Sequence, residues 1–125
     1  KLPDSVCCQK DMIDLILQGN KLCRLPEDLG SLSSLRYLLV SDNCLEVLPD
    51  SLCNLVKLNW LYVYNNRLRS LPVGLLKKMT SLERLLIEAN PLSGESIQDT
   101  LSNVPPDLRA LGMDTQQLSS WYGMG

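Results

Sequence analysis

The sequence predicts an α/β solenoid, a curved parallel sheet of about five short strands with irregular or short helical segments on its convex side. The first observation behind this fold is a fixed period, because the dipeptide Leu-Pro recurs with its prolines 23 residues apart, at Pro3, Pro26, Pro49 and Pro72. The second is a leucine pattern that recurs between these dipeptides. Such a period is typical of a repeat array, in which each repeat buries its apolar face against its neighbours.

The leucine pattern reads L-x-x-L-x-L-x-x-N-x-L. It fits residues 12–22, 35–45, 58–68 and 82–92 with few substitutions. In its L-x-L part the apolar residues alternate, as in a short strand with one buried face. The residues that we expect to point inward are Leu15 and Leu17, Leu38 and Val40, Leu61 and Val63, and Leu85 and Ile87.

The LPxxLxxLxxL pattern connects one predicted strand to the next, and we expect it on the outer, convex side of the solenoid. Proline opposes a further strand or an immediate helix there, so we expect irregular or short helical segments. An asparagine follows each predicted strand, at Asn20, Asn43, Asn66 and Asn90. The chain must turn sharply at these positions, and an inward amide offers donors and an acceptor to the buried backbone of the turn.

These four matches, together with the Leu-Pro signature, resemble the leucine-rich repeat family over nearly the whole chain. The resemblance implies a ladder of inward asparagines at Asn20, Asn43, Asn66 and Asn90. The 23-residue unit of the Leu-Pro type is most similar to intracellular signalling members of the family, such as the Ras-suppressor and scribble-type scaffolds.

We predict a single leucine-rich repeat domain over residues 1–125. It comprises a partial repeat at 1–11, repeats near 12–34, 35–57, 58–81 and 82–107, and a degenerate terminal repeat with a cap at 108–125. The chain starts with Lys1 and inside a repeat, which favours an excised fragment of a longer protein.

The outward positions of the strands are the expected binding surface, because solenoids usually bind on this concave face. Of the six aromatic residues in the chain, four fall in outward positions and none in an inward consensus position. Tyr and Trp suit interfaces because each offers a large apolar area and one polar group. The predicted partner-binding residues are Tyr37, Leu39, Trp60, Tyr62, Tyr64, Arg84 and Leu86, with Asp42, Glu88 and Arg67 as a polar rim.

A purely structural interpretation of the same residues stays open. The face of a sheet tolerates residues with a high strand propensity, and Arg84 could simply stack on Trp60 as a local cation–π pair. A flanking region of a longer protein could also cover this face.

The sequence offers little for catalysis. The chain has no histidine, no phosphate-binding loop of the GxxxxGK type, and no histidine partner for the adjacent Cys7 and Cys8. Asp14, Asp42 and Glu88 lie on different predicted strands and rows. We therefore expect no enzyme activity within these residues, no cofactor and no metal site.

The predicted function is a protein–protein interaction module, a signalling scaffold or adaptor in the cytoplasm. A net charge of −2 without a basic run argues against nucleic acid, and no apolar run is long enough to span a membrane. The five cysteines are odd in number and there is no N-glycosylation motif, which favours a reducing compartment.

Two alternatives remain open for the function. The chain could be the substrate-recognition module of a larger enzyme, such as a ubiquitin ligase, phosphatase or kinase. It could also be a fragment of a receptor ectodomain that binds a pathogen or lipid ligand. The identity of the partner and the oligomeric state are not predicted.

Overall fold

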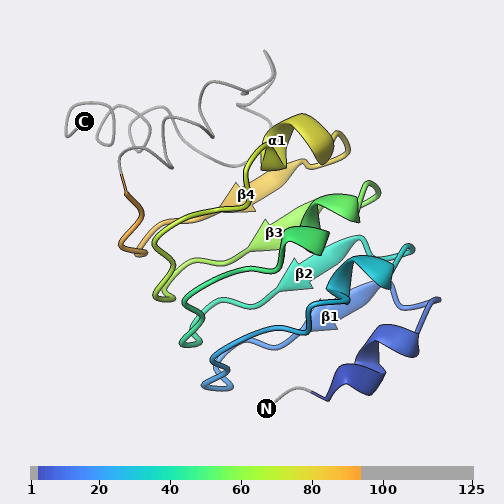
Figure 1. Cartoon of the computed structure of the whole chain (residues 1–125), viewed down its shortest axis with the longest axis horizontal. Helices are drawn as coiled ribbons and strands as arrows, with labels where there is room; N and C mark the ends of the chain where they lie inside the picture. Colours follow the sequence, from blue (N-terminus) through green and yellow to red (C-terminus); the bar gives the residue numbers. More distant parts are fainter. Residues whose placement is uncertain (1–2, 94–125) are drawn as a thin grey trace.

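A computed structural model of the chain describes residues 3–93. Its four strands lie side by side in sequence order in one parallel sheet (Figure 1). The strands are β1 (Asp14–Ile16), β2 (Tyr37–Leu39), β3 (Trp60–Tyr62) and β4 (Arg84–Leu86). The predicted parallel solenoid is thereby confirmed, while the strand expected near residue 108 lies outside the described residues.

The register of the sheet keeps equivalent positions of successive repeats side by side. Asp14 pairs with Tyr37, Tyr37 with Trp60, and Trp60 with Arg84. The backbone pairing also runs beyond the strands, because Gly19 N–H donates to the Ser41 carbonyl and Asp42 N–H to the Tyr64 carbonyl. Outward side chains of neighbouring strands therefore line up in rows across the sheet.

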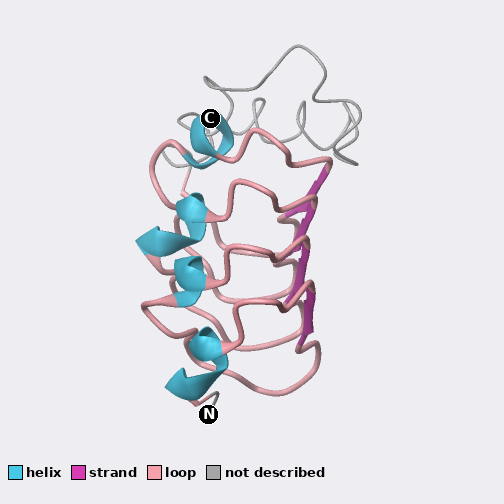
Figure 2. Ribbon diagram, turned by 90° about the vertical axis from the view of Figure 1, so that its right-hand side faces the viewer, coloured by secondary structure: helices cyan, strands magenta, loops and turns pink. Residues whose placement is uncertain are grey.

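The convex side carries short helices, which confirms the expectation from the Leu-Pro stretches. They are the 3-10 helices η1 (Asp4–Cys8), η2 (Leu29–Ser31) and η3 (Asp50–Asn54) and the α-helix α1 (Leu75–Lys78). Figure 2 shows these helices along one side of the solenoid and the strands along the other. Pro3 and Pro49 adopt extended backbone conformations directly before η1 and η3, where a missing N–H costs nothing.

The core lies between the sheet and the convex helices and consists mainly of leucines. Leu38, Leu61 and Leu85 have no exposed surface, so the inward positions predicted for β2, β3 and β4 are confirmed. Leu17 is only half-buried. It follows β1, which has a neighbouring strand on one side only among the described residues.

Neighbouring repeats approach closely on the convex side at Gly30. Its N–H donates to the Ser51 hydroxyl at 3.0 Å, and this hydroxyl donates to the Glu27 carbonyl at 2.6 Å. A Cβ atom at position 30 would collide with the backbone carbonyl of Ser51. Glycine at this position therefore sets the spacing between η2 and η3.

Candidate functional site

Each strand is followed by a residue in the left-handed backbone conformation, one position before the turn asparagine. These residues have positive φ angles, +73° at Gly19, +58° at Asp42, +55° at Asn65 and +56° at Ala89. Gly, Asn and Asp adopt this conformation most readily, whereas Ala pays a steric cost. At Asp42, Asn65 and Ala89 the reversal of the chain turns the next side chain, the asparagine, toward the backbone of the preceding repeat.

The side chains of the buried Asn43 and Asn66 and the half-buried Asn90 join their turns to the preceding repeat. The Asn43 amide oxygen accepts from Leu22 N–H at 2.9 Å, and its amide nitrogen donates to the Leu17 carbonyl at 3.0 Å. Asn66 donates to the Val40 and Val63 carbonyls, at 3.1 and 3.0 Å. Asn90 makes the corresponding bonds one repeat further on, to the Val63 and Ile87 carbonyls.

The expected ladder does not extend to Asn20. This side chain is exposed, and its amide donates at 3.3 Å to the carbonyl of Gln18, two residues earlier in its own turn. The cause is its place in the array, because the other asparagines bond to the backbone of a preceding strand. Among the described residues no strand precedes β1.

The four predicted aromatic residues form one continuous cluster on the outward face of the sheet. The Tyr37 ring meets the Trp60 ring edge to face, with centroids 4.8 Å apart. Trp60 stacks parallel to Tyr62 at 6.0 Å, and Tyr62 lies 6.3 Å from Tyr64. All four side chains are half-buried, so each ring still presents area to solvent.

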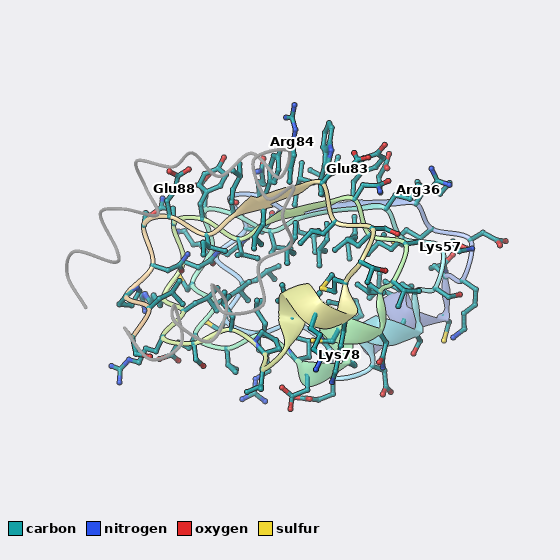
Figure 3. The ribbon with its side chains drawn as sticks, turned by 90° about the horizontal axis from the view of Figure 1, so that it is seen from above. Arg36, Lys57, Lys78, Glu83, Arg84 and Glu88 are labelled. Atoms are coloured by element: carbon teal, nitrogen blue, oxygen red, sulfur yellow. The ribbon has the colours of Figure 1, made fainter. Side chains whose placement is uncertain are left out.

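Arg84 extends this cluster onto β4. Its guanidinium carbon lies 4.8 Å from the centre of the Trp60 ring, and its Nη1 donates to the Tyr62 hydroxyl at 3.2 Å. Figure 3 shows Arg84 projecting from the sheet side of the molecule, opposite Lys78 of α1. The local cation–π pair is therefore present, and the arginine side chain stays exposed to solvent.

An apolar row runs beside the aromatic residues. The register aligns Ile16, Leu39, Tyr62 and Leu86 across the sheet, as their spacing in the sequence predicts. Ile16 is 60% exposed, and Leu39 and Leu86 are half-buried. We call the set Tyr37, Leu39, Trp60, Tyr62, Tyr64, Arg84 and Leu86 the aromatic surface.

The predicted polar rim lies in the turns beyond the aromatic surface. Asp42 is exposed and accepts a hydrogen bond from the Asn65 amide at 2.7 Å. Arg67 is exposed and Glu88 is half-buried. These three residues border the aromatic surface.

Two features of the face were not predicted. By strand alternation Ser41 falls in an outward position, two residues after Leu39, but it is fully buried, and its hydroxyl has no hydrogen-bond partner among the described residues. A serine is short enough to be covered by larger neighbours in its row, and residue spacing carries no information on such cover. The predicted binding set also omitted Asp14 and Ile16, although both are exposed on β1.

The described residues contain no group of three or more His, Cys, Asp and Glu side chains that could hold a metal ion. No helix within that part of the chain is both long and apolar enough to cross a membrane. Burial raises the pKa of the Cys53 thiol, while Lys78 opposes the shift and Asp50 adds to it. A thiol kept protonated in this way acts as a packing group.

The sequence matches the family model described as "Leucine-rich repeat region" over residues 12–122. The chain therefore belongs to the leucine-rich repeat family, as its repeat pattern predicted. Domains of this fold commonly bind other proteins and are typically not enzymes. No curated protein compared with the sequence matches it.

Solved structures show the same fold. A leucine-rich repeat protein of Leptospira interrogans superposes with a TM-score of 0.78 at 33% identity, over 84% of this chain and 26% of its own. An internalin (inlF) of Listeria monocytogenes gives 0.74 at 21% identity, over 97% of this chain and 36% of its own.

A third similar structure is the leucine-rich repeat ectodomain of the plant membrane receptor kinase GASSHO1/SCHENGEN3 from Arabidopsis thaliana, solved in complex with Casparian strip integrity factor 2. It superposes with a TM-score of 0.67 at 27% identity, over 82% of this chain and 13% of its own. The chain thus spans between an eighth and about a third of these three proteins.

Proposed function

We propose that this chain is a protein-binding module and that its contact area is the aromatic surface. The observation that carries the proposal is the continuous contact of Tyr37, Trp60, Tyr62 and Tyr64 with Arg84 on the outward face of the sheet. Tyr, Trp and Arg are the residues most enriched among the energetic centres of protein interfaces.

We propose that the aromatic surface binds its partner as a largely preformed, rigid surface. The strands beneath the surface are fixed by their neighbours and by the buried asparagines, and the rings already rest on one another. Little backbone or side-chain freedom is then lost on binding, so more of the contact energy remains as affinity. The apolar row beside the rings adds apolar surface that is removed from water when a partner binds.

We propose that the module acts as a scaffold or adaptor in the cytoplasm. Its Cys8 and Cys23 side chains are exposed thiols, which persist in a reducing compartment. The repeat type, with its Leu-Pro signature every 23 residues, is the second support, because it resembles that of intracellular signalling scaffolds.

A second candidate function is the recognition part of a larger receptor or enzyme. The similarity to the receptor kinase ectodomain, which was solved with Casparian strip integrity factor 2, favours this candidate. That relationship rests on 27% identity, and the chain spans 13% of that protein. A catalytic domain or a membrane anchor in the same polypeptide would favour this second candidate over the scaffold.

The test is a capture experiment from cell lysate with three baits. They are the parent, a Tyr62→Glu, Tyr64→Glu variant of the aromatic surface, and a Val56→Glu, Val73→Glu control on the convex half of the molecule. Both control positions are exposed, at 53% and 78%, so the control adds the same charge without touching the sheet. Circular dichroism establishes that all three baits are folded.

The proposal expects a partner that the parent and the control retain and the aromatic-surface variant loses. A partner held equally by all three baits would contradict it, because the contact would then lie away from the aromatic surface. Loss of the partner from the control alone would move the binding site to the convex side.

A further inference from the structure

The first row of outward side chains carries opposite charges at its two ends. The register places Asp14 on β1, Tyr37 and Trp60 in the middle, and Arg84 on β4. Asp14 and Arg84 are both exposed. The row is therefore aromatic in its centre, negatively charged at its β1 end and positively charged at its β4 end.

Arg84 is held in place while most of its hydrogen-bonding capacity stays available. The Trp60 ring supports the guanidinium plane, and one nitrogen donates to the Tyr62 hydroxyl. A guanidinium has five N–H donors, and its preferred partner is a carboxylate bound by two parallel hydrogen bonds. Within residues 3–93 the polar contact of this side chain is to a neutral hydroxyl, so its charge meets no carboxylate there.

The spacing of the two charges fits an extended peptide segment. The ends of the row are three strand spacings apart, and Arg84 leans back over Trp60, so the charges are separated by about 10–14 Å. An extended chain covers this distance in about four residues at ~3.4 Å each. In such a chain, residues at positions i, i+2 and i+4 point to the same side.

We propose that the aromatic surface binds an extended protein segment with an acidic side chain at Arg84 and a basic side chain at Asp14, four residues apart. The residue midway between them is apolar and rests on Tyr37 and Trp60. Arg84 and Asp14 then determine which segment is accepted and in which direction it runs. This inference rests on the proposed function and adds the chemistry of the partner to it.

The apolar row supports the choice of an extended segment. Ile16, Leu39, Tyr62 and Leu86 run parallel to the charged row and offer a strip that crosses all four strands. A segment that lies on the charged row also borders this strip along its length, so its side chains can reach the strip while its ends meet Asp14 and Arg84. Opposite charges at the ends of a contact suppress binding in the reversed direction, because each end would meet a like charge.

The test is a selection from displayed peptides of random sequence that are long enough to cross the sheet. The parent is compared with Arg84→Gln and with Asp14→Asn, which remove one charge each and keep a polar side chain. Arg69→Gln and Asp28→Asn are matched controls, because both residues are exposed and lie outside the strands. Far-UV circular dichroism shows that each protein is folded.

The parent is expected to enrich peptides with an acidic residue and a basic residue four positions apart and an apolar residue between them. Arg84→Gln should remove the acidic preference and Asp14→Asn the basic one, and both controls should keep the parent's preferences. For one synthetic peptide from the selection, Arg84→Gln should weaken binding about tenfold, the loss typical of one exposed charge-assisted contact.

Two results would overturn the inference. In the first, the enriched peptides show no such charge spacing, or Arg84→Gln keeps the acidic preference; the proposed function still stands if Tyr62→Glu, Tyr64→Glu abolishes their binding. In the second, the parent enriches no peptide, which excludes an extended segment as the occupant. The lysate capture then decides separately whether the aromatic surface binds a folded protein.

Discussion

The turns after β2 and β3 each depend on two consecutive residues, one in the left-handed backbone conformation and one buried asparagine. In the second repeat these residues are Asp42 and Asn43, and in the third they are Asn65 and Asn66. The first reverses the chain at low cost, and the second satisfies backbone groups of two neighbouring repeats. Each turn therefore contributes both to its own repeat and to the contact with the preceding one.

Asn66→Ala is expected to lower the free energy of unfolding by about 3 kcal/mol or more. It leaves Leu45 N–H and the carbonyls of Val40 and Val63 without their buried partner. Urea denaturation measures the change. Asn20→Ala is the matched control and should stay within about 0.5 kcal/mol of the parent, because its side chain is exposed. Equal losses in both variants would contradict the difference between these two positions.

Ala89→Gly is expected to raise the free energy of unfolding by about 0.5–1 kcal/mol. Ala89 has φ +56°, where an L-residue pays ~1–2 kcal/mol that glycine does not pay, and part of this gain is offset by the greater flexibility of glycine in the unfolded chain. The reverse change, Gly19→Ala, should destabilise by about 1 kcal/mol, since no atom lies within 4 Å of the added Cβ and only the backbone is strained. Thermal melts of both variants test the opposite signs.

A single strand with its returning segment buries too little apolar surface to be stable alone. Three-residue strands gain their stability from stacking, because Leu38, Leu61 and Leu85 form one continuous layer beneath the sheet. The convex helices close the other side of this layer, and Gly30 allows two of them to meet closely. Loss of packing in a central repeat should therefore weaken both of its neighbours.

Leu61→Ala is expected to lower the free energy of unfolding by about 2–5 kcal/mol, since it opens a cavity at a fully buried position between two strands. Val73→Ala is the control, with a side chain that is 78% exposed, and should change stability by less than about 0.5 kcal/mol. Chemical denaturation of both variants gives the two values. A Leu61→Ala transition that coincides with that of the parent would contradict the assignment of the inward layer.

The whole molecule presents a rigid sheet whose outward face differs sharply from its core. Nearly all core positions are aliphatic, whereas the aromatic residues of the described chain gather on the outward face. A fold that required aromatic residues for packing would bury them. Their position outside the core, in contact with Arg84, is the physical reason to place binding on this face.

Tyr62→Ala is expected to weaken the affinity for the captured partner by about 2 kcal/mol or more, which is roughly thirtyfold in Kd. Tyr62 contacts Trp60, Tyr64 and the Arg84 guanidinium, so its removal disturbs the centre of the surface. Isothermal titration calorimetry measures the affinity, with Val56→Ala as a control on an exposed side chain away from the strands. An unchanged Kd for Tyr62→Ala would exclude this residue from the contact.

Much of the fold could be predicted from the sequence because leucine spacing directly reports which side chains face inward. The alignment of Tyr37 with Trp60, and of Leu39 with Tyr62, followed from the constant repeat length. The burial of Ser41 and the exposure of Asn20 could not be predicted from the repeat length, because both depend on which neighbours are present rather than on periodicity. The hydrogen bond from Arg84 to Tyr62 depends on side-chain rotamers, which a repeat pattern does not specify.

The most direct measurement is site-specific photo-crosslinking in cell lysate, with a benzophenone amino acid placed at Leu39 on the aromatic surface or at Val73 on the convex side. Both positions are apolar, and Leu39 borders Tyr62 across the sheet while Val73 is exposed two residues before α1. Binding through the aromatic surface predicts a discrete protein adduct from position 39 and none from position 73. An adduct from position 73 alone would contradict it and place the contact on the convex side.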